Sequence, residues 1–271
     1  MKLKVRANRS RPDSADHAVL IPSKGRPKAL AKLFVSCPSL NAPHTYIGVE
    51  RAELDLYTQV MGPLWSKVNV VVITNPDGIT SWAREQLRRV AVKKGYTRYV
   101  LSDDNCRFSG EALQALLDAQ ALTHGVVAGS HKTAPHFQSD RIERGTTHVV
   151  SEGKQLLVYP HVGMIFWCIP GVYYREFRYP LDCYYDDVYL ILWLASKGFT
   201  NFTACLEAVF DKHRHEPGGT GNDAQRVLKM AQGLQRLAWD FPQWMVSQWV
   251  QTRVPYTKIM EAAANGQNGF R

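Results

Sequence analysis

Two adjacent aspartates follow a short apolar segment that has the composition of a buried strand. The segment Tyr99–Leu101 is followed by Ser102, and Asp103, Asp104 and Asn105 come next. Two carboxylates this close cost electrostatic energy unless water, a cation or a basic group offsets their charge. Magnesium and manganese are bound by carboxylates and shared with substrate phosphates. The pair therefore predicts a divalent-metal site, with an acidic turn that caps the following helix as the alternative.

A second acidic pair, Asp186 and Asp187, stands at the start of a predicted helix. The helix macrodipole stabilises negative charge there, so capping is one interpretation. The other is that one carboxylate acts as a base and deprotonates an acceptor hydroxyl. The later segment "DKHRHEPGGTGND" carries His213 and His215, which could bring an imidazole to the same metal. Its glycines would let the backbone approach a ligand closely.

Two common nucleotide-binding motifs are missing from the sequence. No G-x-x-x-x-G-K-[ST] motif occurs, and no G-x-G-x-x-G motif follows the first apolar segment. The first absence excludes a P-loop protein, and the second disfavours a dinucleotide-binding fold.

The segments that would position these residues alternate between strand and helix. Strands are expected at residues 17–22, 44–50, 68–74, 97–104 and 125–130, with helices at 28–37, 51–62, 80–95 and 109–122 between them. This alternation predicts an α/β fold with a mostly parallel sheet and helices on both faces. Ligands of such sheets bind at the carboxyl ends of the strands. Ser23, Lys24, Glu50, Asn75 and the pair Asp103–Asp104 all fall there.

The pattern changes after residue 130. A polar segment with a hairpin near residues 152–154 precedes a buried strand at 162–170 and a helix at 184–198. Residues 224–264 are expected to be helical, with Trp239, Trp244 and Trp249 packing against the core. We therefore expect a basic flexible arm at 1–16, a main domain at 17–221 divided after residue 130, and a helical C-terminal extension at 222–271.

The charge balance points to a polyanionic partner. The chain has 33 Lys+Arg against 24 Asp+Glu, a formal net charge of +9. Five of the basic residues precede the first acid, Asp13: they are Lys2, Lys4, Arg6, Arg9 and Arg11. Such an arm suits contacts with the phosphates of nucleic acid, although a solvated tail without a partner is the alternative.

Composition also bears on the compartment. The five cysteines are scattered without C-x-x-C spacing, so reduced, mostly buried thiols are expected rather than disulfides or a zinc site. No apolar run approaches the roughly 18 residues of a membrane span, and the basic N-terminus has no apolar segment after it. A cytoplasmic protein without a membrane partner is the expectation.

Five segments, in order and with fitting spacing, resemble motifs of the GT-A glycosyltransferases, nucleotide-sugar enzymes with a Rossmann-like sheet. "VLIPSKGRP" resembles the opening strand and loop that hold the nucleoside, and "NPDGITSWAREQLRRVA" is similar to the segment that begins a helix near the diphosphate. "VLSDDN" stands where the metal-binding D-x-D motif belongs. "YYDDVYLILWLASKGF" resembles the acidic helix start that supplies the base in inverting members. "DKHRHEPGG" resembles the late loop that completes the metal site.

This resemblance implies a division of the main domain and a role for each candidate residue. Residues 17–130 would bind a nucleotide sugar, through Pro22, Ser23, Lys24, Arg26, Glu50, Asn75, Gly78, Arg84, Ser102 and Asp103. Manganese or magnesium would be held by Asp104, alone or with Asp103, and by His213 or His215. Residues 131–221 would supply the base, Asp186 or Asp187, of which Asp187 is favoured by position. The chain departs from the family in having D-D-N for D-x-D and Asp-Asp for Glu-Asp, and inversion is inferred only from the acidic helix start.

The short opening motif and the basic balance look most like the glycosyltransferases of tailed phages that modify hydroxymethylated pyrimidines in DNA. That resemblance implies a UDP-sugar donor, 5-hydroxymethylcytosine or another hydroxymethylated pyrimidine in duplex DNA as acceptor, and the host cytoplasm as location. The basic residues near the second motif would contact diphosphate and DNA: they are Arg84, Arg88, Arg89, Lys93, Lys94 and Arg98. An enzyme of this kind must reach its base in the major groove or by flipping it.

Three alternatives stay open on the sequence. The first is a GT-A enzyme that acts on a saccharide, lipid or protein acceptor. The second is a nucleotidyltransferase on a related sheet, which would release pyrophosphate. The third is a non-catalytic nucleic-acid-binding module, although carboxylates in a cleft give a polyanion binder no advantage.

Overall fold

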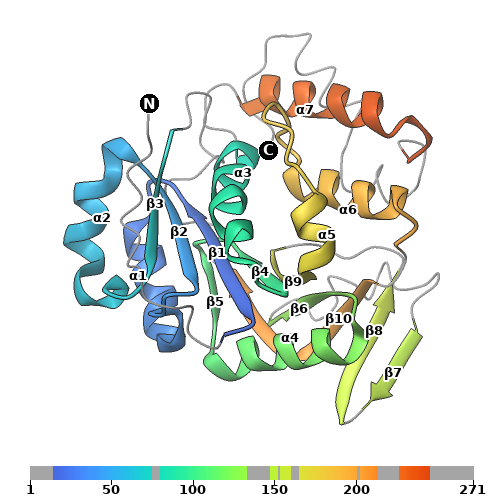
Figure 1. Cartoon of the computed structure of the whole chain (residues 1–271), viewed down its shortest axis with the longest axis horizontal. Helices are drawn as coiled ribbons and strands as arrows, with labels where there is room; N and C mark the ends of the chain where they lie inside the picture. The colour runs from blue at the N-terminus through green and yellow to red at the C-terminus, as the bar shows by residue number, and fades with distance from the viewer. Residues whose placement is uncertain are drawn as a thin grey trace.

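One sheet runs through the whole described part of the chain (Figure 1). The computed structural model describes residues 15–74, 80–132, 147–151, 153–159, 165–199, 202–212 and 226–244. Ten described strands form the sheet in the order β3-β2-β1-β4-β9-β6-β10-β8-β7, with β5 paired to β10. The strands are β1 His17–Ser23, β2 Thr45–Glu50, β3 Asn69–Ile73, β4 Arg98–Ser102, β5 Cys106–Phe108, β6 Val126–His131, β7 Thr147–Ser151, β8 Lys154–Tyr159, β9 Phe166–Pro170 and β10 Phe202–Lys212.

The N-terminal half of the sheet is parallel, as its alternation of strand and helix predicts. β1 pairs in parallel with both β2 and β4, and β2 pairs in parallel with β3. The chain thus builds outward from β1 to β3 and then returns to the other side of β1 to form β4. The carboxyl ends of β1 and β4 therefore flank the point where the strand order reverses, which is where open α/β sheets bind ligands.

The C-terminal half completes the same sheet with strands of both directions. β9 is antiparallel to β4 and β6, between which it lies, and β10 is parallel to β6. The expected hairpin forms from β7 and β8, and β8 is antiparallel to β10. Strands that follow residue 131 are therefore hydrogen-bonded to strands that precede it, and the two predicted halves share one sheet.

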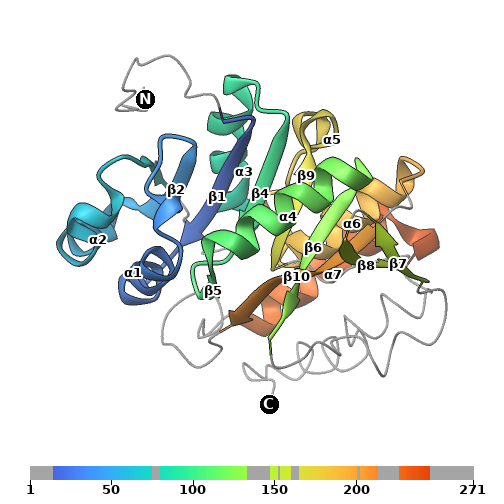
Figure 2. The same cartoon turned by 90° about the horizontal axis from the view of Figure 1, so that it is seen from below.

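Helices cover both faces of the sheet (Figure 2). Side chains alternate along β1, so Ala18 and Leu20 join one core cluster while Val19 and Ile21 join the other. The first cluster is covered by α3 Thr80–Ala91, α5 Gly171–Glu176, α6 Asp186–Ser196 and α7 Arg226–Asp240. The second is covered by α1 Pro27–Ser36, α2 Leu54–Met61 and α4 Gly110–Thr123. Each helix buries an apolar face against the sheet, which is the main source of its stability.

The C-terminal extension is helical where it is described. α7 packs through Leu234 and Leu237 on the cluster that includes α6, and residues 245–271 lie outside the described part of the chain. The expectation that Trp239 packs is wrong, because 84% of this side chain is exposed. Its position on α7 turns it away from the face that carries Leu234 and Leu237. The side chains of Trp244 and Trp249 are among those not described.

Every described helix falls short of the length and apolar character that crossing a bilayer requires. The described cysteines are all unpaired and buried, as the sequence predicts: they are Cys37, Cys106, Cys168, Cys183 and Cys205.

Candidate active site at the carboxyl ends of β1 and β4

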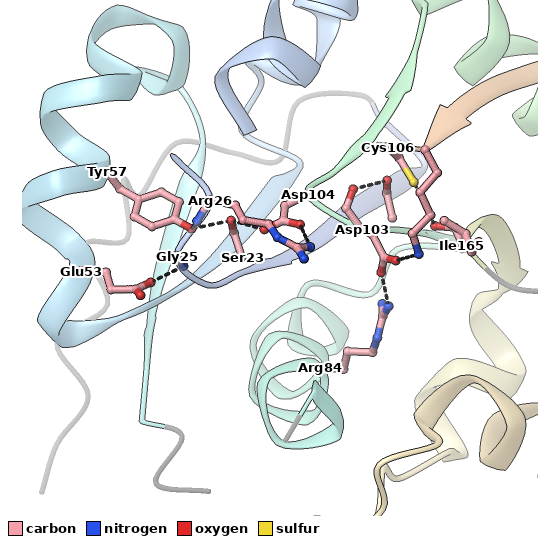
Figure 3. Close-up of polar contacts among 12 residues, drawn as sticks. Ser23, Gly25, Arg26, Glu53, Tyr57, Arg84, Asp103, Asp104, Cys106 and Ile165 are labelled. Carbon is pink, nitrogen blue, oxygen red and sulfur yellow. Dashed lines mark hydrogen bonds and ion pairs between the residues drawn. The ribbon is translucent and has the colours of Figure 1, made fainter. Parts of the chain in front are cut away.

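Asp104 fastens the end of β4 to the end of β1. Its buried carboxylate accepts a hydrogen bond from Ser23 Oγ at 2.7 Å and contacts the guanidinium of Arg26 at 3.3 Å (Figure 3). Ser23 has one hydroxyl proton, which goes to Asp104, so the Tyr57 hydroxyl donates to Ser23 at 2.6 Å. Tyr57 in turn accepts the Arg26 backbone N–H at 3.0 Å. These hydrogen bonds connect the carboxyl ends of β1 and β4 to each other and to α2 at the point where the strand order reverses.

Burial dominates the electrostatics of Asp104. It raises the pKa of this carboxyl to about 6, against the lowering effect of Ser23 and Arg26, and the neighbouring charge of Asp103 adds to the rise. Both oxygens of Asp104 are already engaged, one by Ser23 and the other by Arg26. Of the two adjacent aspartates, Asp104 thus has a bonding role between strands.

The loop after β1 is held by two acidic residues, one at the end of β2 and one in the turn before α2. Lys24 Nζ lies 2.9 Å from Glu50 Oε1. The Gly25 N–H donates to Glu53 Oε2 at 2.9 Å (Figure 3). Pro22 lies in β1 beside Gly48 of β2. The predicted nucleoside-loop residues Pro22, Ser23, Lys24, Arg26 and Glu50 are therefore brought together on one edge of the sheet. Glu53 and Tyr57 belong to the same arrangement and were not predicted.

Asp103 points the other way, toward two cations. One carboxylate oxygen accepts from Arg84 at 2.8 Å and the other accepts from Lys212 Nζ at 2.9 Å. Burial favours a raised pKa, but the charges of Lys212 and Arg84 outweigh it and hold the pKa of Asp103 below its ordinary value. Asp103 is therefore ionised at neutral pH. The preceding residue, Ser102, donates its hydroxyl to the Asp103 carbonyl at 3.0 Å and is fully buried.

Arg84 joins the two acidic motifs that the sequence singles out. Its guanidinium contacts Asp103 at the end of β4 and also Asp186 at the start of α6. Burial raises the pKa of Asp186 above its ordinary value, more than the Arg84 charge lowers it. Asp187, the next residue, is half-buried and accepts the Val188 N–H at 2.8 Å. Asp103 and Asp186, which are far apart in the sequence, thus both contact the guanidinium group of Arg84.

Some predicted residues do not take the expected positions, and others cannot be placed. Arg88 is buried and donates to Glu85 at 2.8 Å and 2.9 Å, and Arg98, at the opposite end of β4, donates to the Leu117 carbonyl and to Asp16. The expectation that these arginines face DNA or diphosphate is wrong, because the Arg88 guanidinium is bonded to buried Glu85 and the Arg98 guanidinium is bonded to Asp16 and the Leu117 carbonyl. Asn75, Gly78, His213 and His215 lie outside the described residues.

Lys212 is the site residue that sequence reasoning missed. It ends β10, a strand that was not predicted, and it directly precedes the histidine loop. The pairing of β10 with β5 sets Lys212 opposite Cys106, and the Cys106 N–H donates to the Asp103 carbonyl at 3.2 Å. This turn between β4 and β5 therefore places Asp103 next to Lys212. No local sequence signal identifies Lys212, because its contact with Asp103 depends on the long-range pairing of β10 with β5.

Of the two adjacent aspartates, Asp103 is the more accessible to a metal ion, because its side chain is 26% exposed and that of Asp104 is 6% exposed. No group of three or more His, Cys, Asp or Glu side chains able to hold a metal is found among the described residues. Magnesium characteristically binds through one or two carboxylates together with substrate phosphates and water, so a complete protein cage is not required. The Asp103 oxygens contact Arg84 and Lys212, so a metal ion bound to this carboxylate would replace one of these two cations. The described donor set fits an ion shared with a phosphate substrate.

The fold matches solved structures at low sequence identity. The mannosyltransferase PcManGT from Pyrobaculum calidifontis, in complex with GDP-Man and Mn²⁺, matches with a TM-score of 0.59 and 12% identity, covering 98% of this chain and 77% of that chain. A mycobacterial protein matches with a TM-score of 0.50 and 12% identity, covering 83% of this chain and 74% of that one. No protein-family model matches the sequence, and no curated protein is significantly similar to it. The likeness shows the fold, and the predicted α/β, Rossmann-like GT-A class is confirmed.

Proposed function

We propose that this chain is a glycosyltransferase that moves a sugar from a nucleoside diphosphate to a hydroxyl acceptor. The observation that carries the proposal is the link between Asp103 and Asp186 through Arg84. It joins an acid at the end of β4 to an acidic helix start on a sheet whose neighbours include a mannosyltransferase in complex with GDP-Man. A donor site and an acceptor base have to be this close for one transfer step.

The donor would lie across the reversal point between β1 and β4. The loop Ser23–Arg26 would contact the nucleoside, and Arg84 with the start of α3 would face the diphosphate. A UDP-sugar is proposed from the sequence resemblance, and the GDP-Man of the structural neighbour makes a GDP-sugar the competing donor. The acidic residues Glu50 and Glu53 lie near the loop. Carboxylates accept hydrogen bonds, and guanine offers them adjacent N–H donors whereas uracil does not, so these residues would favour guanine.

A divalent ion is proposed as the cofactor, with Asp103 as its carboxylate ligand and His213 or His215 as further ligands. Such an ion would supply positive charge to the diphosphate as it leaves. The structural neighbour is in complex with Mn²⁺, which makes manganese the first ion to test and magnesium the second.

Asp187 is proposed as the base. Its neighbour Asp186 is buried against Arg84, whereas Asp187 is half-buried at the start of α6 and so is open to an acceptor. In the step, the acceptor oxygen forms a bond to the anomeric carbon and its proton passes to Asp187. The bond from the anomeric carbon to the phosphate oxygen breaks, and its electron pair leaves with the nucleoside diphosphate. Direct displacement of this kind inverts the anomeric centre.

Hydroxymethylated pyrimidine in duplex DNA is the acceptor that we propose. Its support is the net charge of +9 and the five basic residues before Asp13, together with the family resemblance. A DNA substrate needs such sequence-independent contacts with its phosphates. An uncharged saccharide acceptor would not need them.

The test is release of nucleoside diphosphate from a panel of UDP- and GDP-sugars, with manganese, magnesium or EDTA. Each donor is offered with hydroxymethylcytosine-containing duplex DNA, with plain DNA and without DNA. Release that requires the hydroxymethyl group supports the whole proposal and identifies the sugar. Release that ignores DNA keeps the glycosyltransferase and rejects the acceptor. Pyrophosphate release from nucleoside triphosphates, with no turnover of any nucleotide sugar, would indicate a nucleotidyltransferase instead.

A further inference from the structure

Lys212 is held at the centre of the candidate site by three strands. It ends β10, which is parallel to β6 and antiparallel to β5. The Asp103 N–H donates to the Ile165 carbonyl at 3.3 Å, and the Cys106 N–H donates to the Asp103 carbonyl, so the turn that carries Asp103 is fixed from both sides. The ammonium group of Lys212 therefore has a defined position, 2.9 Å from Asp103 Oδ2.

This ammonium group has more N–H donors than its hydrogen bond to Asp103 requires. A lysine ammonium carries three N–H donors, and the bond to Asp103 uses one of them. Its side chain is 21% exposed, so it reaches the surface of the site while most of its stem is covered. Arg84, on the other side of Asp103, has its Nη1 buried with no hydrogen-bond partner in the described part of the chain.

A further unpaired donor lies on the same helix as Arg84, three residues before it. The Ser81 hydroxyl is fully buried in the first turn of α3 and has no hydrogen-bond partner among the described residues. The first turn of a helix presents unpaired N–H groups and a positive potential that attracts anions. Unsatisfied buried donors are costly unless a ligand pairs with them. Ser81, Arg84 and Lys212 together offer hydrogen bonds and charge suited to a phosphate anion.

We propose that Lys212 is a diphosphate-binding cation of this site, acting with Arg84 on the two sides of Asp103. The proposal deepens the function proposed above and rests on it. Lys212 keeps its place on Asp103 before the donor binds, and its spare donors pair with the phosphate oxygens. When the bond to the anomeric carbon breaks, the electron pair and the added negative charge go to the phosphate oxygen. A fixed ammonium group stabilises that charge without reorganising.

The experiment compares Lys212→Met and Lys212→Arg with the wild-type chain by calorimetric binding. The ligands are UDP, GDP, uridine and guanosine, each with EDTA and with manganese. Lys212→Met is expected to weaken binding of the nucleoside diphosphate by about 10- to 100-fold. Binding of the nucleoside is expected to stay unchanged. Lys212→Arg keeps the charge in a group of different shape and is expected to weaken diphosphate binding less than Lys212→Met does. Lys67→Met is the matched control, because Lys67 is exposed and precedes β3 at the opposite end of the sheet from the site.

The outcomes separate this proposal from the function on which it rests. If the wild type and Lys212→Met bind the nucleoside diphosphate equally, Lys212 does not contact it, and the glycosyltransferase proposal stands without this residue. An equal loss of nucleoside binding would likewise overturn the diphosphate role. If the wild type binds no nucleoside diphosphate with or without manganese, both proposals fail. Thermal unfolding checks each variant, and Lys212→Gln, which keeps a donor but not the charge, replaces Lys212→Met if that variant does not fold.

Discussion

Asp103 and Asp104 are adjacent residues with opposite surroundings. Asp104 turns toward Ser23 and Arg26, where burial raises its pKa to about 6. Asp103 turns toward Arg84 and Lys212, which hold its pKa below the ordinary value. The repulsion between neighbouring carboxylates is thus offset differently on each side: two cations offset the charge of Asp103, whereas Ser23 and Arg26 offset that of Asp104 only in part.

This difference predicts that Asp104→Asn stabilises the chain at high pH. The folded-state pKa of Asp104, about 6, exceeds its ordinary value of 3.8, so its stabilising contribution is complete below pH 3.8 and is lost as the pH rises through 6. Asparagine does not ionise and still accepts from Ser23. Between pH 4 and pH 8 the wild type should lose about 2–3 kcal/mol of unfolding free energy relative to the variant. Urea unfolding in EDTA measures this.

The exposed change Asp118→Asn on α4 is the control for the Asp104 experiment. Its unfolding free energy should follow the wild type across the pH range. If the unfolding free energy of Asp104→Asn also changes with pH in parallel with that of the wild type, Asp104 ionises with its ordinary pKa. That result would contradict the burial of its carboxyl group between β1 and β4.

At the scale of elements, α3 is the part that ties the two sides of the site together. Arg84 reaches Asp103 and Asp186 from its first turns. The next residue, Glu85, accepts from Arg88, Arg89 and the Tyr179 N–H, which fixes α3 against the segment before α6. The order of these charges along one helix sets the distance between the acidic motifs.

Glu85→Gln should therefore destabilise the chain strongly. It leaves the guanidinium of Arg88, which is 2% exposed, without its carboxylate, a change that costs about 3–5 kcal/mol. Burial alone would raise the pKa of Glu85, but the hydrogen bonds from Arg88 and Arg89 lower it below 4.5. The stabilisation is present above pH 4.5 and is lost as the pH falls through the lowered pKa, so the gap between variant and wild type should close in acid. Denaturant unfolding at pH 7 and pH 3 measures it.

Glu176→Gln, at the exposed end of α5, is the matched control for Glu85. It removes the same charge without a buried partner and should change the unfolding free energy by less than about 0.5 kcal/mol. A similarly small effect for Glu85→Gln would mean that the buried ion pairs do not hold α3.

Close packing of β6 against its neighbours gives a second prediction at this scale. A Cβ at Gly129 would lie 2.6 Å from the Ala208 carbonyl and 2.6 Å from the Phe166 ring. Gly129→Ala should lower the unfolding free energy by about 1–3 kcal/mol, since β6, β9 and β10 would have to separate. Gly110→Ala, where the nearest atom is 3.7 Å away, serves as the control in the same thermal-unfolding assay. Equal melting temperatures for the two variants would contradict the packing of β6.

The elements show how far the sequence predicts this molecule. The strands of the parallel half have apolar, β-branched stretches between helices with clear ends, and each is found near its predicted bounds. β10 was missed because a register shift between Cys205 and Val209 breaks its two-residue alternation, and β5 was missed because it has three residues. Lys212 lies at the end of the missed strand. Its contact with Asp103 comes from long-range pairing, which local patterns do not contain.

The same limit applies to charge. From sequence, α3 is a basic helix with one acid, but the structure turns that acid inward together with Arg84 and Arg88. Whether an arginine neutralises a buried carboxylate or faces a ligand depends on the partners that other elements bring. The candidate acids at strand and helix ends were predictable because ligand sites follow from topology.

At the scale of the whole molecule, Arg84 and Arg88 are buried, so the positive charge that attracts DNA has to come from other basic residues. Residues 1–11 hold five basic residues and no acid, so their removal lowers the formal net charge from +9 to +4. We expect a chain lacking residues 1–11 to bind duplex DNA more weakly. The slope of log K against log salt should become shallower by up to about 4–5, because each phosphate contact contributes about 0.9.

Fluorescence anisotropy with a labelled duplex at several salt concentrations measures that slope. A chain in which the same five residues are replaced by serine separates charge from length and should behave like the truncated one. An unchanged slope in both variants would contradict a role for the arm in DNA binding.

The central claim is that Asp103 and Asp187 are two halves of one site, one for the donor and one for the acceptor proton. The most direct test measures donor binding and sugar transfer separately in Asp103→Asn and Asp187→Asn, with the nucleotide sugar that the wild type turns over. We predict that Asp103→Asn weakens donor binding at least about tenfold. Asp187→Asn should bind the donor normally and transfer sugar about 10²- to 10⁴-fold more slowly. Normal transfer by either variant would contradict the assignment of these two acids.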